Sequence, residues 1–168
     1  MPRKRPKKIT PDYLERAALF YLERYSSSAE NLRRVLDRKV RRSIQEHGAP
    51  EASETAQWIG ALVTKLQRNG LLDDTAYAIG RVRRLYAEGK ALGRIRQIMA
   101  AKGVAKPDIE AALERLQTEA EGPISDLPAA ISYARKRQLG PYRADPAERA
   151  AMRQKDMGAL ARSAGSAR

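Results

Sequence analysis

Apolar residues recur every three or four positions along most of the chain, and this spacing is typical of amphipathic α-helices. The pattern is clearest between residues 65 and 104, where Ala78, Val82 and Leu85 form one apolar stripe. Arg81 and Arg84 lie on another face of the same predicted helix. The spacing therefore predicts an all-α protein whose helices have an apolar side and a basic side.

The ends of these predicted helices carry residues with capping chemistry. Gly70 and Gly103 each follow an amphipathic run, and glycine readily adopts the left-handed conformation that ends a helix. Asp73 can accept hydrogen bonds from the free N–H groups of the next helix, and Asp74 adds negative charge to its first turn. We interpret the two aspartates as a helix start, because neighbouring carboxylates on a chain lack the facing geometry that acid–base catalysis requires.

The N-terminal part of the chain repeats this organisation. Thr10, which precedes a proline, predicts the start of a first helix. Ser27 and Glu30 stand at the spacing of a capping box before a second helix. A third apolar run contains Trp58 and ends at Gly70, and we expect Trp58 to belong to the core.

The two halves of the chain are related by an internal repeat of roughly 63 residues, which indicates a modular protein. Leu36 and Lys39, for example, align without gaps onto Met99 and Lys102. A third unit follows an acidic linker. In this unit we expect the second helix to run without a break from Pro146 onward, and we expect no third helix after it. The predicted parts are a disordered basic arm (1–9), two three-helix repeats (10–70 and 71–120) and an incomplete third repeat (121–168).

Composition narrows the class of partner. The 168-residue chain has a formal net charge of +13 and a pI near 10.3, which favours nucleic acid or a nucleoprotein surface. It has no cysteine and one histidine, His47, which argues against metal sites built from thiolates or histidine clusters. No apolar run approaches the roughly 18 residues of a membrane span, and the start lacks the apolar core of a signal peptide. We expect a cytoplasmic protein without a cofactor.

The sequence contains no constellation that predicts an enzyme. Gly89 and Gly93 do not form a phosphate-binding fingerprint, because no strand precedes them. Some tyrosines near basic clusters could stack on the bases of single-stranded nucleic acid, but half-buried packing is the commoner role of tyrosine at helical spacing, and we favour it. These tyrosines are Tyr25, Tyr77, Tyr86, Tyr133 and Tyr142.

The central stretch resembles the RecX family of recombinase regulators. The resemblance is carried by Gly70-Leu71-Leu72-Asp73-Asp74, Ala76-Tyr77-Ala78, Arg84, Gly89, Ile95-Arg96-Gln97 and Lys102-Gly103-Val104. Near the C-terminal end, the third unit is similar to that of alphaproteobacterial members in Tyr133 to Arg137, Gly140 to Arg143 and Lys155-Asp156. The resemblance covers about residues 10 to 165.

The resemblance implies tandem three-helix repeats, related to helix-turn-helix bundles, in an elongated and curved arrangement. It also implies binding to the RecA recombinase and its filament on single-stranded DNA. Such regulators limit ATP hydrolysis, filament extension and strand exchange, and so act in recombination, DNA repair and the SOS response. The chain departs from the family pattern in its third unit, which normally closes with another helix.

The basic faces are the candidate contact surfaces, with complementary charge aiding attraction and register. We expect a monomer that contacts the recombinase and, weakly, DNA. The chief alternative is a sequence-specific helix-turn-helix regulator that reads duplex DNA, and non-specific nucleic-acid packaging is a third. The candidate contact residues, chosen by charge, are Arg33, Arg34, Lys39, Arg81, Arg84, Arg94, Arg96, Lys102, Arg135 and Arg137.

Overall fold

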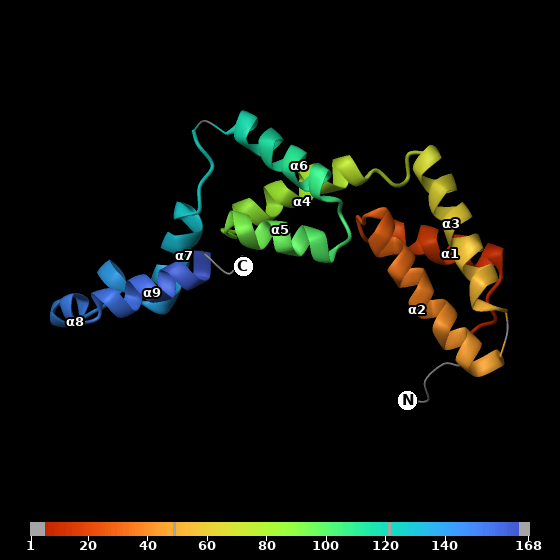
Figure 1. The fold of residues 1–168 in the computed structure, drawn as a ribbon, viewed down its shortest axis with the longest axis horizontal. Helices are drawn as coiled ribbons and strands as arrows, with labels where there is room; N and C mark the ends of the chain where they lie inside the picture. The colour runs from red at the N-terminus through yellow and green to blue at the C-terminus, as the bar shows by residue number, and fades with distance from the viewer. Residues whose placement is uncertain (1–5, 49, 121, 165–168) are drawn as a thin grey trace. The chain divides into compact units, whose positions relative to one another are not determined.

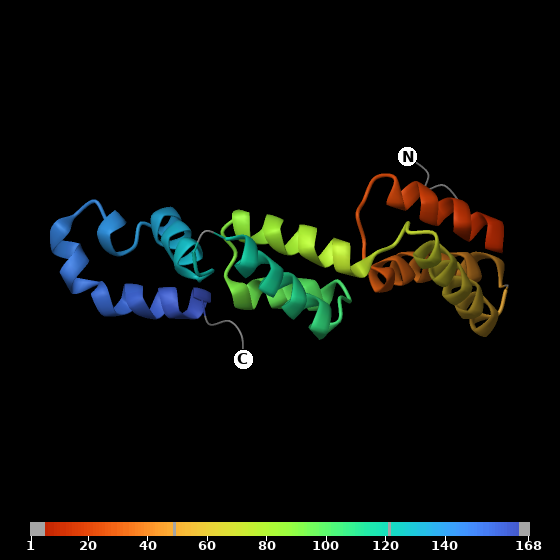
Figure 2. The same ribbon diagram turned by 90° about the horizontal axis from the view of Figure 1, so that it is seen from above.

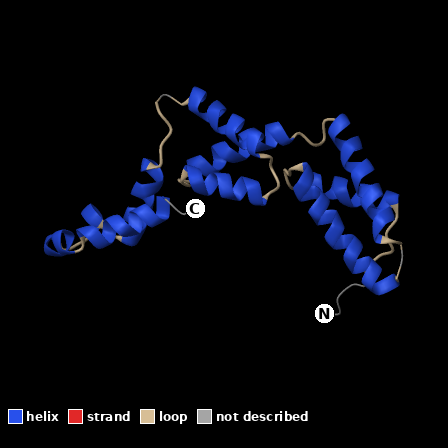
Figure 3. Cartoon of the chain, viewed as in Figure 1, coloured by secondary structure: helices blue, strands red, loops and turns tan. Residues whose placement is uncertain are grey.

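The computed structural model describes residues 6–48, 50–120 and 122–164, and every regular element in these ranges is helical (Figures 1 and 3). The helices of the described ranges fall into three successive sets, which confirms the prediction of an all-α protein built of helical repeats, but the third set, predicted to be incomplete, also contains three α-helices. Their bounds are α1 Pro11–Leu22, α2 Ala29–His47, α3 Ala52–Arg68, α4 Asp74–Ala87, α5 Leu92–Ala101, α6 Lys106–Glu119, α7 Leu127–Arg137, the 3-10 turn η1 Gly140–Tyr142, α8 Pro146–Ala151 and α9 Arg153–Ala164.

The chain folds as two compact units. The first unit comprises Met1–Tyr77 and Lys102–Val104, and the second comprises Ala78–Ala101 and Ala105–Arg168. We call α1 to α3 the first repeat, α4 to α6 the second and α7 to α9 the third. The predicted boundaries at residues 70 and 120 stay a prediction.

The first unit has a continuous apolar core. Helices α1, α2 and α3 pack against one another, and α2 lies beside α3 in both views (Figures 1 and 2). Leu14, Leu36 and Val63 are fully buried between them. Trp58 is partly buried against this core, as expected. Burial of the apolar stripes therefore holds the first repeat together.

The start of α1 corrects the predicted arm. The Thr10 hydroxyl accepts the Tyr13 N–H at 3.1 Å, so Thr10 caps the helix as predicted. Ile9, however, is buried in the core together with Leu14. The prediction of disorder is therefore wrong for residues 6–9, while residues 1–5 lie outside the described residues. Ile9 and Leu14 stand at the spacing of a hydrophobic staple, which is the signal that the sequence offered.

The start of α2 also differs from the prediction. Ser28, and not Ser27, is the cap, because its hydroxyl oxygen accepts the Asn31 N–H at 3.1 Å. The same hydroxyl donates to the Lys102 carbonyl at 2.5 Å, and the Asp74 carboxylate accepts the Ala29 N–H at 2.7 Å. Residues distant in the sequence therefore decide which serine caps α2.

Glycine and aspartate end and begin helices in the predicted places. Gly70 has a φ of 71°, in the left-handed region, and the Asp73 carboxylate accepts the Ala76 N–H at 2.8 Å. Gly103 has a φ of 76°, and a Cβ there would overlap the Glu30 side chain. Two constraints thus require glycine at position 103, the backbone conformation and the lack of space.

The second repeat is joined to the third in a similar way within the second unit. The Asp126 carboxylate accepts the Leu92 N–H at 2.6 Å. The Tyr86 hydroxyl donates to the Ser125 carbonyl at 3.4 Å and accepts the Ser125 N–H at 3.3 Å. The predicted linker therefore supplies both the cap of α5 and a contact for α4.

The third repeat corrects the prediction of one long second helix. That helix is split into α8 and α9 at Met152, whose φ of −97° and ψ of 1° interrupt it. The split lets α9 pack against α7 and places Asp156 beside the loop after α7. The third α-helix of this repeat comes from the split and not from a further apolar run.

Asp156, which is buried, and Arg143, which is half-buried, form an ion pair in the third repeat. Arg143 donates two guanidinium N–H groups to the carboxylate, at 2.9 and 2.8 Å, and the Gly140 N–H donates at 2.8 Å. These hydrogen bonds, first those from Arg143 and then that from Gly140, lower the pKa of Asp156 from 3.8 to about 2. The carboxylate is therefore charged and fully engaged.

Candidate partner-binding surfaces

The structure places all ten predicted contact residues at the surface, with Arg33 and Arg81 half-buried. It distributes them over both units. The first unit contains Arg33, Arg34 and Lys39 on α2 together with Lys102, and the second contains Arg81 and Arg84 on α4, Arg94 and Arg96 on α5, and Arg135 and Arg137 on α7.

Several of these arginines are already paired with carboxylates. Glu30 lies 2.9 Å from Arg34 and 3.8 Å from Arg33, and Glu88 lies 3.0 Å from Arg84. All are helical pairs three or four residues apart and contribute little to stability, since they are exposed. They nevertheless reduce the charge that these arginines present to a partner.

Arg96 is the most strongly engaged of the predicted residues. It donates to both carboxylate oxygens of Glu110 on α6, at 2.8 and 3.0 Å. This bidentate hydrogen bond raises the pKa of Arg96 and lowers the pKa of Glu110. Arg96 therefore has a structural role between α5 and α6, which its position in the sequence did not show.

Aromatic rings hold two arginines of the third repeat. The Arg135 guanidinium lies 5.5 Å from the centre of the Tyr142 ring, and that of Arg137 lies 6.0 Å from the Tyr133 ring. Both tyrosines are half-buried, which agrees with the predicted packing role. A cation over a ring keeps its full charge, so these arginines remain able to meet an anion.

Three of the predicted cations have no internal partner. In the part of the chain that the structure describes, the side chains of Lys39, Arg81 and Lys102 make no hydrogen bond or ion pair. Such cations keep their whole charge for an external anion. They are the strongest candidates of the predicted set.

A hollow between α5 and α7 is lined by three cations, two of which were not among the predicted contact residues. Lys90, Arg94 and Lys136 line it, together with Glu88, which is paired with Arg84. Gly89, with a φ of 72°, makes the turn before Lys90, and both residues line the hollow. Only Arg94 was predicted, because Lys90 lies in a turn and Lys136 joins it only through the tertiary fold. We call this the α5–α7 hollow.

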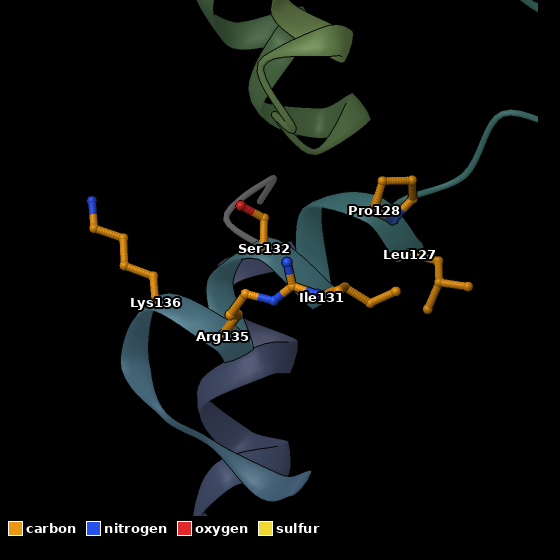
Figure 4. Close-up of a pocket in the computed structure, with 6 residues that line it drawn as sticks. All are labelled: Leu127, Pro128, Ile131, Ser132, Arg135 and Lys136. Atoms are coloured by element: carbon orange, nitrogen blue, oxygen red, sulfur yellow. The ribbon is translucent and has the colours of Figure 1, made fainter. Parts of the chain in front are cut away.

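The outer face of α7 combines apolar and basic side chains (Figure 4). Leu127 is 64% exposed and Ile131 is 40% exposed, and both line a shallow pocket with Arg135 and Lys136. In the close-up these side chains all come from α7. The apolar stripe of this helix is thus only partly covered, with Ala134 its one buried residue among those described.

Neither a metal site nor a membrane span is found in the described residues. They contain no group of three or more histidine, cysteine, aspartate or glutamate side chains that could hold a metal ion. No helix in the described ranges is long and apolar enough to cross a membrane.

Comparison with known proteins identifies the family. A sequence model described as RecX, second three-helix domain, matches residues 73–113. Regulatory protein RecX of Myxococcus xanthus (strain DK1622) is 45% identical over 159 residues, which cover 95% of this chain and 82% of that protein. The chain belongs to the RecX family. It is also 33% identical to Regulatory protein RecX of Agrobacterium fabrum (strain C58 / ATCC 33970) over 127 residues, or 76% of this chain and 63% of that protein.

A solved RecX structure has the same fold. The structure, described as the crystal structure of regulatory protein RecX, matches with a TM-score of 0.59 and 23% identity over 94% of this chain and 68% of that one. At this identity the match supports the fold alone. The residues that carry the RecX resemblance, such as Gly70, Asp73 and Gly103, end or begin helices here, so they identify the family without identifying its contact surface.

Proposed function

We propose that this chain binds the RecA recombinase filament on single-stranded DNA and inhibits its ATP hydrolysis, extension and strand exchange. It would thereby act in recombination, DNA repair and the SOS response, as a monomer in the cytoplasm. Its membership of a family of regulatory proteins supports a regulatory role. The observation that carries the proposal is the presence, in both units, of surface cations that have no counter-ion among the residues that the structure describes: Lys39, Arg81 and Lys102.

These cations suit a nucleoprotein partner for an electrostatic reason. A cation that already has a carboxylate gains little from a partner, because the internal pair must first be given up. An unpaired cation gains the whole attraction to a phosphate or carboxylate and releases the counter-ions condensed on DNA. Arg96 is therefore a weaker contact, because its guanidinium is already bound by Glu110. The better contacts are Lys39, Arg81, Lys102 and the α5–α7 hollow.

The test measures ATP hydrolysis by RecA on single-stranded DNA. We expect the unaltered chain to slow hydrolysis at substoichiometric amounts. A variant with Lys39→Ala, Arg81→Ala and Lys102→Ala should need about tenfold more protein for the same effect, because three electrostatic contacts are lost.

A matched control removes the same charge from paired cations. Lys65→Ala, Arg84→Ala and Arg115→Ala remove cations bound to Glu15, Glu88 and Glu119. This variant should inhibit nearly as well as the unaltered chain. Equal loss in both variants would mean that net charge alone acts, and no inhibition by the unaltered chain at low salt would reject the proposal.

Competition with duplex DNA separates this proposal from its chief alternative. A sequence-specific regulator would retain one duplex against an excess of random duplex, whereas a filament-binding protein should be captured by RecA filaments in preference to bare DNA. The second helix of a helix-turn-helix reads bases through free side chains. In α5 the Arg96 side chain is not free, which is why we rank the alternative second.

A further inference from the structure

A hollow on the first unit is lined by four aromatic rings, and core packing explains only two of them, Tyr13 and Tyr21. Tyr13, Phe20, Tyr21 and Tyr25 line it. Phe20 is 59% exposed and Tyr25 is 57% exposed. The predicted packing role is therefore wrong for Tyr25, which lies beyond the end of α1 and is exposed. Tyr77, Tyr86, Tyr133 and Tyr142 are half-buried as predicted. We call this site the aromatic hollow.

The rings of the aromatic hollow are held in place before any ligand binds. The Tyr21 hydroxyl accepts a hydrogen bond from the Asn31 side chain at 3.1 Å. The Tyr25 ring lies 5.1 Å from that of Tyr21, and its backbone N–H donates to the Tyr21 carbonyl at 2.9 Å. The Arg24 guanidinium covers Phe20 at 3.7 Å from the ring centre. A flat ligand would therefore meet rings that need little ordering.

Cations surround these rings. Lys7, Arg16 and Lys39 line the hollow, and no carboxylate does so among the described residues. The Ser43 hydroxyl donates to the Lys7 carbonyl at 2.9 Å and so holds this part of the N-terminal segment against α2. None of the three cations makes an ion pair within the described chain. The ligand that fits has a flat apolar part and flanking negative charges.

We propose that the aromatic hollow binds single-stranded nucleic acid by stacking bases on Phe20 and Tyr25. Lys7, Arg16 and Lys39 neutralise the phosphates on either side. Every base offers a flat face, so such a site is tolerant of sequence and combines stacking with a strong dependence on salt. An apolar peptide would leave the three cations unpaired, and a cationic ligand would be repelled. The site goes beyond the proposed function because it requires no recombinase.

The first experiment measures binding of the full chain to a labelled thymidylate strand, without recombinase, by fluorescence anisotropy. A strand of about 12 nucleotides spans the site sizes usual for such grooves. The double variant Phe20→Ala and Tyr25→Ala should bind about tenfold or more weakly, because stacking on each ring is lost. Met157→Ala, which removes an equally exposed apolar side chain from the second unit, should leave the affinity unchanged.

A strand without bases separates stacking from charge. An abasic strand has the same phosphates, so the unaltered chain should bind it more weakly than thymidylate, while the double variant should bind the two alike. Lys7→Ala, Arg16→Ala and Lys39→Ala together should lower the salt slope by about 2. Equal binding of both strands by the unaltered chain would overturn the proposal. So would a lack of binding to bare strands, and that result would leave filament inhibition to be judged by its own assay.

Discussion

The first and third repeats of this chain are stabilised by different interactions. The first is built around a cluster of apolar side chains that includes fully buried Leu14, Leu32 and Leu36. In the described part of the third, only Ala134 and Asp156 are buried. Apolar burial is non-directional and spread over many contacts, whereas an ion pair depends on a few atoms. The third repeat therefore depends on individual side chains to a degree that the first does not.

The ion pair of the third repeat shows what such dependence means. Asp156 binds the backbone at Gly140 and the side chain of Arg143, and the Arg143 carbonyl in turn accepts two hydrogen bonds from Arg149, at 3.0 and 2.8 Å. Removing the buried member of such a partly buried pair leaves the charge of the other with less compensation, which costs more than the pair itself contributes.

Leu36→Ala should destabilise the first unit by about 2 to 5 kcal/mol, because it leaves a cavity in a closely packed core. Chemical denaturation followed by Trp58 fluorescence reports on this unit, where Trp58 packs against the same core. Val35→Ala, on a half-buried neighbouring position of α2, serves as the control and should cost less. A similar loss for both would show that the first repeat does not depend on its buried cluster.

Asp156→Asn should open the third repeat while the first unit stays folded. The amide cannot hold the two guanidinium hydrogen bonds of a carboxylate, and Arg143 is left without its buried counter-charge. Hydrogen exchange of the α7 and α9 amides should become much faster. The control is Glu148→Gln, since Glu148 is exposed and lies 3.4 Å from Arg143. Unchanged protection in Asp156→Asn would argue that apolar contacts suffice in this repeat too.

The stability of the third repeat should depend on acid. The folded pKa of Asp156 is about 2 and the ordinary value is 3.8. Because the pKa of Asp156 is lower in the folded state, its carboxylate stabilises the repeat at pH values above the ordinary pKa. This stabilisation is lost as the pH falls from the ordinary pKa toward 2. Exchange of α7 and α9 amides, corrected for the intrinsic rate, should therefore accelerate over this range. Asp156→Asn should remove that part of the pH dependence, and a persisting dependence would assign it to other carboxylates.

Asp74→Ala and Asp126→Ala should each destabilise by about 0.5 to 2 kcal/mol, as loss of a helix cap does. The first removes the acceptor for the Ala29 N–H of α2, and the second that for the Leu92 N–H of α5. In the third repeat Asp145 caps α8 locally, through the Ala147 N–H at 2.9 Å. Asp145→Ala should therefore affect α8 alone, whereas Asp74→Ala should accelerate hydrogen exchange in a repeat other than its own. Effects confined to α4 would contradict this expectation.

The sequence predicts those features that depend on neighbouring residues. The predicted helix ends are found at Thr10, Asp73 and Gly70. An N-terminal cap needs only the next few backbone N–H groups, and a C-terminal glycine needs only a positive φ, so both can be predicted from neighbouring residues. Long-range contacts are invisible to the same reasoning. The choice of Ser28 over Ser27 depends on Lys102, and the split at Met152 accompanies the approach of Asp156 to Gly140.

Charge patterns predict the binding surface only in part. Arg96 and Lys39 look alike in the sequence, yet Glu110 reaches Arg96 from α6 and no carboxylate reaches Lys39 in the described chain. Lys90 and Lys136 lie far apart in sequence and line one hollow. In the sequence, Phe20 looks like any other apolar residue of an amphipathic helix. Only its exposure in the structure makes it a candidate for stacking on bases.

The cap of α2 has a consequence for synthesis on the ribosome. Asp74 follows Ala29 by 45 residues, and Lys102 follows Ser28 by 74. All three helices of the first repeat are therefore translated before the carboxylate and the carbonyl that complete the start of α2. In the nascent chain, the N-terminal end of α2 therefore lacks these two hydrogen bonds until α4 and α5 have emerged. The first repeat can thus complete its folding only after the second repeat has been synthesised.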